Sequence, residues 1–169
     1  MIPRRPDFAA WTWQTPEENP VPDLLSLLQS AQRFIRVSAF GFTLAPVVDE
    51  LVLAHGRGVD VKIILDSYQA SGKAAKVQVA KLQKAEVPLI IGTSARGGII
   101  HLKMLLVDDA IWSGSWNFSK SANKQDNDVF LLQLPSGFNS KHLAKFEREW
   151  ERLRAKEEAK AKRRPPPNS

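Results

Sequence analysis

Two polar side chains, His101 and Lys103, interrupt a run from Ile99 to Val107 that is otherwise apolar. Such a run predicts a buried strand, in which residues two positions apart share a face and lie about 6.6 Å apart. Burying an imidazole and an ammonium there is unfavourable by several kcal/mol unless an anion meets them. The pair therefore predicts a phosphate site, with an imidazole nitrogen of His101 able to attack phosphorus and form a covalent intermediate.

A second polar pair, Ser115 and Asn117, repeats this spacing at the end of the next expected strand. Gly114 precedes the pair and permits close approach of the backbone. A hydroxyl and an amide can donate to the non-bridging oxygens of a phosphate. Together with Lys103 they would stabilise the charge on a pentacovalent phosphorus.

Asp108 ends the apolar run and lies seven positions from His101. The odd separation places it on the other strand face, roughly 23 Å away along an extended strand. We therefore expect a structural role for Asp108, accepting backbone N–H groups in the turn. No metal site and no cofactor are expected, because Lys103 would repel a divalent cation and the aspartates near strands share no face with a suitable lysine. These aspartates are Asp60, Asp66, Asp108 and Asp109.

The elements that position these residues alternate between strands and helices, which predicts an α/β fold with a mostly parallel or mixed sheet sandwiched between helices. Capping residues and apolar spacing predict helices over about 23–32, with Asp23 as the cap, 46–56, 71–86, with Ser71 as the cap, and 139–154. Strands are expected at 34–40, 59–65, 88–91, 99–107, 110–113 and 129–134, with 92–98 as a loop.

The 169 residues suffice for one domain with its own core. Residues 1–22 are expected to form an extended arm packed by Trp11 and Trp13, residues 23–154 the catalytic domain, and residues 155–169 a basic, proline-ended disordered tail. The chain has no cysteine, no apolar signal sequence and no apolar stretch long enough to span a membrane. We expect a cytoplasmic protein, or a periplasmic one if a leader has been removed.

The net charge of +6 favours a polyanionic partner, although residues 151–169 alone carry seven Lys/Arg against three Glu. Four lysines fall within an arc of roughly 140° on the third expected helix, opposite Ala75, Val79 and Leu82. This lysine face is either a solvated surface or a contact for a phosphate backbone. Trp116 has two interpretations, core packing or stacking on a base. The residues assigned to nucleic-acid binding are Lys73, Lys76, Lys81, Lys84, Arg96, Trp116 and Lys120.

The string His-x-Lys-x4-Asp, followed by Gly-Ser-x-Asn, resembles the signature of the phospholipase D superfamily. The resemblance extends over about residues 24–154 and is closest to the small bacterial endonucleases that carry one motif copy. It implies a phospholipase D-like fold and a metal-independent phosphodiesterase that works through a phosphohistidine on His101, with Lys103, Ser115 and Asn117 as phosphate ligands. The sequence departs from this signature in two ways. The gap from Asp108 to Gly114 is about one residue shorter than is usual in the family, and Asp128 stands where the family commonly has glutamate.

The phosphohistidine route needs a neutral imidazole that attacks phosphorus and a protonated one that donates to the leaving oxygen. The chain holds three histidines and one such motif. His55 and His142 are interpreted as surface or capping residues, the former beside a glycine at a helix end and the latter in the charged closing helix. We therefore expect a homodimer with two-fold symmetry whose two His101 side chains share one active site, as the resemblance also implies.

Taken together, these features favour a non-specific endonuclease that cleaves DNA, RNA or both. One alternative is a phospholipid phosphodiesterase of the same superfamily, although no amphipathic membrane helix is evident. The other is a nucleic-acid-binding protein that has lost catalysis. The intact set of His101, Lys103, Ser115 and Asn117 argues against this second alternative.

Overall fold

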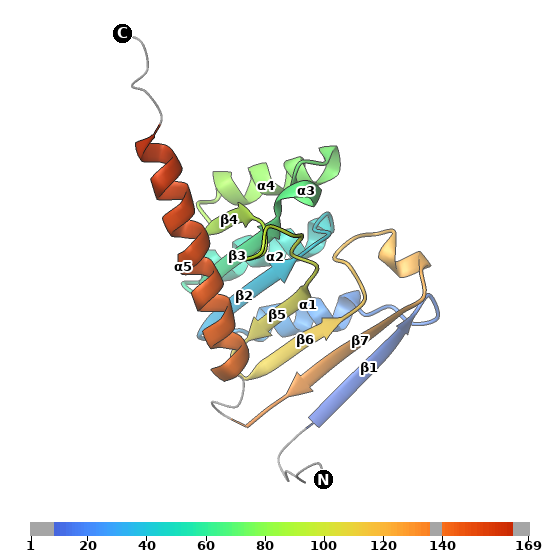
Figure 1. The fold of residues 1–169 in the computed structure, drawn as a ribbon. Helices are drawn as coiled ribbons and strands as arrows, with labels where there is room; N and C mark the ends of the chain where they lie inside the picture. The colour runs from blue at the N-terminus through green and yellow to red at the C-terminus, as the bar shows by residue number, and fades with distance from the viewer. Residues whose placement is uncertain (1–8, 136–139, 164–169) are drawn as a thin grey trace.

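The computed structural model describes residues 9–135 and 140–163, and Figure 1 shows that they form one sheet with helices on both faces. The seven strands in this part of the chain are ordered β1-β7-β6-β5-β2-β3-β4. They are β1 (Ala9–Thr15), β2 (Phe34–Ala39), β3 (Asp60–Asp66), β4 (Leu89–Gly92), β5 (Lys103–Val107), β6 (Ala110–Gly114) and β7 (Asn127–Gln133). The helices are α1 (Val21–Ser30), α2 (Ala45–Gly56), α3 (Ser67–Ala70), α4 (Lys73–Lys84), α5 (Ser140–Lys162) and the 3-10 turn Ala122–Lys124.

The α/β fold is confirmed, and the sheet is mixed rather than mostly parallel. Among the described strands, β2, β3 and β4 pair in parallel, whereas β1 with β7, β7 with β6, β6 with β5, and β5 with β2 are antiparallel. The parallel strands need crossover connections, which α2 and α4 supply, whereas a tight turn suffices between β5 and β6.

Alternate residues of the central strands β2 and β3 contribute to two apolar clusters, one on each face of the sheet. Ile35, Val37 and Ile63 pack into the large apolar cluster beneath α1, α2 and α4. On the other face, Ile64 joins Phe146, and with four further residues they form the cluster beneath α5. Figure 1 shows α5 crossing one face of the sheet, while α1, α2 and α4 cover the opposite face. This two-sided burial explains why β2 and β3 are nearly continuous apolar runs.

Both ends of the described chain differ from the expectations. Residues 9–15 of the expected arm are extended, but they form edge strand β1, which pairs along its whole length with β7. The closing helix does not end near residue 154 but continues through the first part of the expected disordered tail to Lys162. Residues 1–8 and 164–169 lie outside the described residues.

Two helix starts also differ from the expectations. Helix α1 begins at Val21, and Asp23 lies in its first turn, where it accepts a hydrogen bond from the indole of Trp13 at 3.0 Å. The expected helix over 71–86 is two helices, α3 and α4. Ser71 lies between them and caps neither start, because Asp66 caps α3 and Gly72 precedes α4.

Candidate active site

Four of the predicted residues line one open hollow of about 330 Å³: His101, Lys103, Gly114 and Ser115. The hollow lies where β5 begins and β6 ends, two strands that pair in antiparallel. This pairing brings the His-x-Lys segment beside the Gly-Ser-x-Asn turn. A phosphodiester seated there would meet an imidazole, an ammonium and a hydroxyl.

His101 is not in a buried strand, contrary to the expectation for residues 99–107. Strand β5 begins at Lys103, because its partner β2 ends at Ala39 and offers the residues before Lys103 no strand to pair with. The His101 side chain is exposed, and its ring contacts the Phe40 ring edge-on, with 4.8 Å between centroids. The penalty for burying a charge therefore applies to Lys103 alone, and the imidazole is accessible to a substrate.

Lys103 is buried, with 6% of its surface exposed. Its ammonium donates to the backbone carbonyl of His101 at 2.9 Å and lies 5.0 Å from the centre of the Phe40 ring. Burial lowers the pKa of Lys103 below the ordinary value of 10.5, because the charged form loses hydration. A bound phosphate would stabilise the charged form, so the residue is suited to bind an anion.

The turn at Gly114 requires a residue without a side chain. Its φ is +148°, and a Cβ there would lie 2.1 Å from the carbonyl oxygen of Asp128. The Ser115 hydroxyl accepts a hydrogen bond from the backbone N–H of Asp128 at 3.1 Å and donates to the Asn127 side chain at 3.0 Å. The close approach of β6 and β7 thus holds this hydroxyl at the rim of the hollow.

Asn117 lies beside this hollow rather than in its lining. Its Oδ1 accepts a hydrogen bond from the backbone N–H of Gly41 at 3.2 Å, next to Phe40. Backbone bonds between Phe118 and residues 41–44 hold the two segments together. The Asn117 carbonyl is occupied by Gly41, which leaves its amide N–H₂ as the group that could donate to a phosphate oxygen.

Asp128 and Asp108 both lie outside the hollow. Asp128 lines a neighbouring hollow of about 310 Å³ and accepts a hydrogen bond from Gln14 of β1 at 3.2 Å. Within the described residues no hydrogen bond joins Asp128 to His101. Asp108 accepts three backbone N–H groups, those of Gln32, Arg33 and Phe34, at 2.8–3.0 Å. Its carboxylate therefore fastens the start of β2 to the turn after β5.

Among the residues assigned to nucleic-acid binding, Trp116 is placed in the core, which excludes base stacking. It is 1% exposed, contacts Phe118 edge-on and donates its indole N–H to Asn123 at 2.8 Å. Arg96 and Lys120 are exposed, and Arg96 lines a hollow that also includes His101. The α4 lysines are exposed on the face opposite α5, and the ammonium of Lys81 pairs with Asp49. These four lysines are Lys73, Lys76, Lys81 and Lys84.

Sequence reasoning missed two residues that hold His101 in place, Phe40 and Asp66. Asp66 is 1% exposed, and one carboxylate oxygen accepts the N–H groups of Tyr68 and Gln69 at 3.1 Å. The other oxygen accepts the N–H of Ile100, the residue before His101, at 2.8 Å. A signal was available, because an aspartate that directly follows an apolar strand is a common helix cap. Its contact with residue 100 was not visible in the sequence.

Metal-binding clusters and membrane-spanning helices are both absent from the described part of the chain. It contains no group of three or more His, Asp or Glu side chains arranged as a metal site. None of its helices combines the length and the apolar character that crossing a membrane requires.

The mixed sheet and the open hollow of His101, Lys103, Gly114 and Ser115 define an α/β domain with a histidine–lysine site. Its family is identified by a sequence model described as "Cardiolipin synthase, PLD-like domain", which matches residues 24–150. The chain therefore belongs to the phospholipase D-like family, whose enzymes act on phosphodiester bonds.

Individual relatives agree with this assignment. The structure is similar to that of Nuc, a phospholipase D family member from Salmonella typhimurium, with a TM-score of 0.79 and 27% identity, covering 86% of this chain and 95% of that one. A phospholipase D of Rickettsia typhi is 29% identical over 119 residues, 70% of this chain and 56% of its own length. A mitochondrial cardiolipin hydrolase of Xenopus tropicalis is 30% identical over 130 residues, 76% and 60% respectively. The chain thus spans little more than half the length of these curated relatives.

Proposed function

We propose that this protein is a metal-independent phosphodiesterase that cleaves nucleic acid through a covalent phosphohistidine on His101. The observation that carries the proposal is the shared hollow of His101, Lys103 and Ser115. It combines an accessible nucleophile with an ammonium donor and with a hydroxyl that must turn from Asn127 to donate to a phosphate oxygen. In the first step an imidazole nitrogen of His101 attacks phosphorus. The bond from phosphorus to the leaving oxygen breaks, and that oxygen takes a proton from a second imidazole.

In the second step water attacks the phosphohistidine. The P–N bond breaks, His101 is regenerated, and the second imidazole, now neutral, accepts the proton that water loses. Lys103, Ser115 and Asn117 stabilise the charge that builds up on the phosphoryl oxygens in both steps. The backbone N–H of Asp128 donates to the Ser115 hydroxyl, so the contribution of Asp128 would be to hold that hydroxyl in place.

The second imidazole is proposed to be His101 of the partner subunit in a two-fold dimer. Within one chain, His55 lies in the last turn of α2, near the start of β3, and His142 lies in the first turn of α5. The end of α2 and the start of β3 lie at the ends of the strands opposite the end of β6, where the hollow lies (Figure 1). Neither histidine lines the two hollows that include His101.

A nucleic acid is the substrate class that the charge distribution favours. Arg96 and Lys145 line a hollow of about 380 Å³ that also includes His101, so cations flank the nucleophile on the side away from Ser115. The names of the curated relatives favour a phospholipid as the second candidate. A single phosphodiester at His101 suits either substrate, and the test must therefore include both.

The test compares wild type with His101→Ala on labelled single- and double-stranded DNA and RNA and on cardiolipin vesicles, with EDTA present throughout. We expect cleavage of nucleic acid by wild type and a loss of at least about 10³-fold in the variant, because no other described group can form the covalent intermediate. A His55→Ala variant is the control and should retain activity. Cleavage of cardiolipin alone, or complete loss with EDTA, would overturn the nuclease proposal.

The shared site is tested by mixing wild type with His101→Ala after subunit exchange, with the mass in solution recorded. If both imidazoles are needed, only dimers with two wild-type subunits are active, and activity follows the square of the wild-type fraction. A mixture with His55→Ala should show no loss. A linear dependence on the wild-type fraction, or full activity in a monomer, would contradict the shared site.

A further inference from the structure

We propose that the surface at the ends of β3 and β4, beneath the C-terminal half of α5, binds the sugar–phosphate backbone of a polynucleotide strand. The scissile phosphate of that strand lies at His101. The inference rests on the proposed function and extends it, because it assigns a second anion subsite at a distance from the nucleophile. The basic composition of residues 151–169 favoured a polyanionic partner, but the sequence did not predict this subsite, because residues 155–169 were expected to be disordered.

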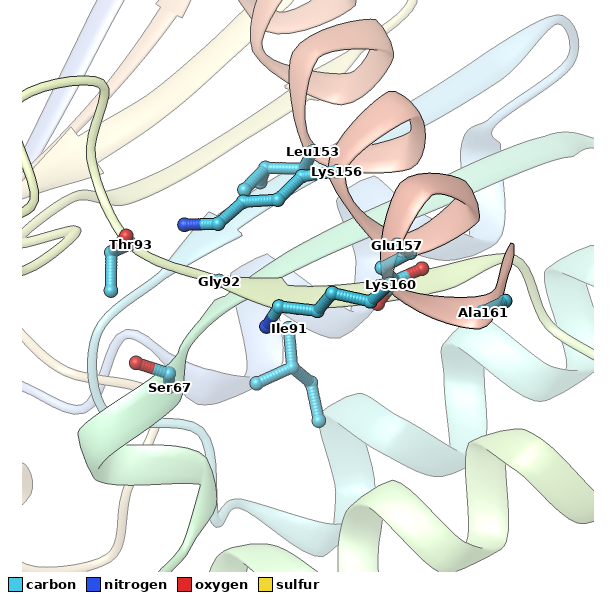
Figure 2. A pocket seen from close by; sticks show the side chains of 9 residues that line it. All are labelled: Ser67, Ile91, Gly92, Thr93, Leu153, Lys156, Glu157, Lys160 and Ala161. Atoms are coloured by element: carbon cyan, nitrogen blue, oxygen red, sulfur yellow. The ribbon is translucent and has the colours of Figure 1, made fainter. Parts of the chain in front are cut away.

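The subsite is a hollow of about 470 Å³ between α5 and the ends of β3 and β4. Figure 2 shows the ammonium groups of Lys156 and Lys160 reaching from α5 over β4, toward the side where Thr93 and Ser67 present their hydroxyls. The carboxylate of Glu157 stays close to the helix. Two cations and two hydroxyls around an open space are the donors that proteins use for backbone phosphates.

These lysines belong to a charged stripe that runs along α5. At 100° per residue its members fall within an arc of roughly 80°, and the stripe is about 22 Å long at 1.5 Å per residue. Four of the five are cationic, and the single carboxylate, Glu149, pairs with Arg152 at 2.7 Å. In the described part of the chain the other three form no ion pair and can neutralise phosphates. The stripe consists of Lys145, Glu149, Arg152, Lys156 and Lys160.

The stripe connects the new hollow to the active site without a break. Lys145 and Glu149 line the middle hollow together with Arg96 and His101, and His101 also lines the active-site hollow. The turn between the new hollow and the middle hollow is short, since the Ser94 N–H donates to the Gly98 carbonyl at 2.8 Å. Arg152 ties this turn to α5 by donating to the Thr93 carbonyl at 2.6 Å. The three hollows therefore lie in a row along one edge.

The spacing of the row selects a ligand with several phosphates. Strand β5 carries Lys103 and strand β4 ends at the new hollow, and three inter-strand steps separate them. At about 4.8 Å a step the separation is about 14 Å, too far for one phosphate to occupy both sites. A single-stranded polynucleotide places a phosphate at every nucleotide and can follow the cations along the edge.

The test is the double variant Lys156→Ala/Lys160→Ala of the full chain. With a labelled 20-nucleotide single strand at about 100 mM salt we expect KM to rise about 10-fold and kcat to stay unchanged. The slope of log affinity against log salt should fall by about 1.4, at 0.7 for each lost phosphate contact. Hydrolysis of bis(4-nitrophenyl) phosphate should be unaffected, because this small diester reaches only His101.

The matched control is Arg154→Ala/Lys162→Ala. It removes the same charge from the same part of α5, but from side chains that lie roughly 140° around the helix from the midpoint between Lys156 and Lys160. Its KM for the 20-mer should change less than about 3-fold. Thermal unfolding of both double variants checks that α5 remains packed.

Binding is also measured without turnover, by fluorescence anisotropy of the labelled 20-mer on a His101→Ala background. A 10-fold loss of affinity on adding the two lysine substitutions supports the subsite even if wild type cleaves no nucleic acid, an outcome in which only the proposed function fails. Three results would overturn the inference. They are an unchanged affinity for the 20-mer, an equal loss of affinity in the control, and weaker binding to anionic lipid vesicles while binding to the 20-mer is unchanged.

Discussion

At the scale of single residues, His101 and Lys103 experience opposite environments although only two positions separate them. The imidazole is exposed and rests against Phe40, whereas the ammonium is buried beneath it and bonds to the His101 carbonyl. A nucleophile must be accessible to phosphorus, whereas a charge stabiliser acts more strongly when it is shielded from water. The backbone achieves both by entering the sheet between the two residues.

Replacing Lys103 by arginine should change the alkaline limb of the pH profile. Burial lowers the pKa of Lys103 from 10.5, so wild-type kcat/KM for a small diester should fall as pH rises, with a midpoint below 10.5. Arginine stays protonated in this range, so Lys103→Arg should lose the limb. It should also be about 10-fold slower at neutral pH, because the larger guanidinium does not fit the buried position. A Lys124→Arg control should keep the wild-type profile, and an identical limb in both variants would refute the assignment.

At the scale of elements, the site is assembled where several strands end. The ends of β2 and β3 and the connection before β5 meet at one edge, as ligand sites do in open α/β sheets. Residues 99–102 have no strand partner, so other contacts must hold them. Asp66 at the end of β3 bonds the Ile100 N–H, and Phe40 N–H donates to the Leu102 carbonyl at 2.7 Å. His101 lies between these two anchors.

The substitution Asp66→Asn should therefore affect catalysis through the position of His101. An amide can still cap α3 with its oxygen, but its N–H₂ cannot accept from Ile100, which loosens the His101 connection. We expect kcat for the small diester to fall about 10- to 100-fold, with little change in the affinity for the 20-mer. An Asp49→Asn control, at an exposed carboxylate, should keep its kcat. Loss of kcat and 20-mer affinity in equal measure would indicate general unfolding rather than positioning.

At the scale of the whole molecule, α5 couples the sheet to the substrate edge. Glu147 of α5 bonds the buried guanidinium of Arg36 at 2.6 Å and the ammonium of Lys62 at 2.8 Å. On either side of Glu147 along the helix, Phe146 and Trp150 pack on the sheet, and the C-terminal half reaches the proposed backbone subsite. One long helix thus anchors in the core at its start and presents cations at its end.

Removing the Glu147 charge should destabilise the protein in a pH-dependent way. Burial alone would raise the pKa of Glu147, but the hydrogen bonds and charges of Lys62 and Arg36 outweigh it and lower the pKa below 4.5. Its stabilising effect is therefore present above pH 4.5 and is lost as pH falls through the lowered pKa. Glu147→Gln should lower the free energy of unfolding by about 1–3 kcal/mol at pH 7.

Urea unfolding followed by tryptophan fluorescence at pH 7, 5 and 3.5 measures this effect. The difference from wild type should be similar at pH 7 and 5 and smaller at pH 3.5. A Glu151→Gln control, in an exposed pair with Arg154, should stay within about 0.5 kcal/mol of wild type at every pH. A difference that does not depend on pH would contradict the role given to the charge.

Much of this protein could be predicted from local patterns. Apolar periodicity located most strands and helices because each pattern reports which face of an element is buried. The His-Lys pair and the Gly-Ser-x-Asn turn also indicated the phospholipase D superfamily, which the family model confirms. Their role as a phosphate site stays a prediction. These features depend on neighbours in the chain, and the amino-acid sequence alone determines them.

The tertiary structure alone decided which side chains face a substrate. His101 is exposed because β2 ends before it, Trp116 is buried because Phe118 and Asn123 cover it, and Asp66 holds residue 100 from 34 positions away. The cations of α5 reach the active-site edge only because that helix continues past β4 (Figure 1). The outcomes for His101, Asp66 and α5 depend on contacts between segments distant in sequence. Periodicity reports only the faces of one element and carries no information about such contacts.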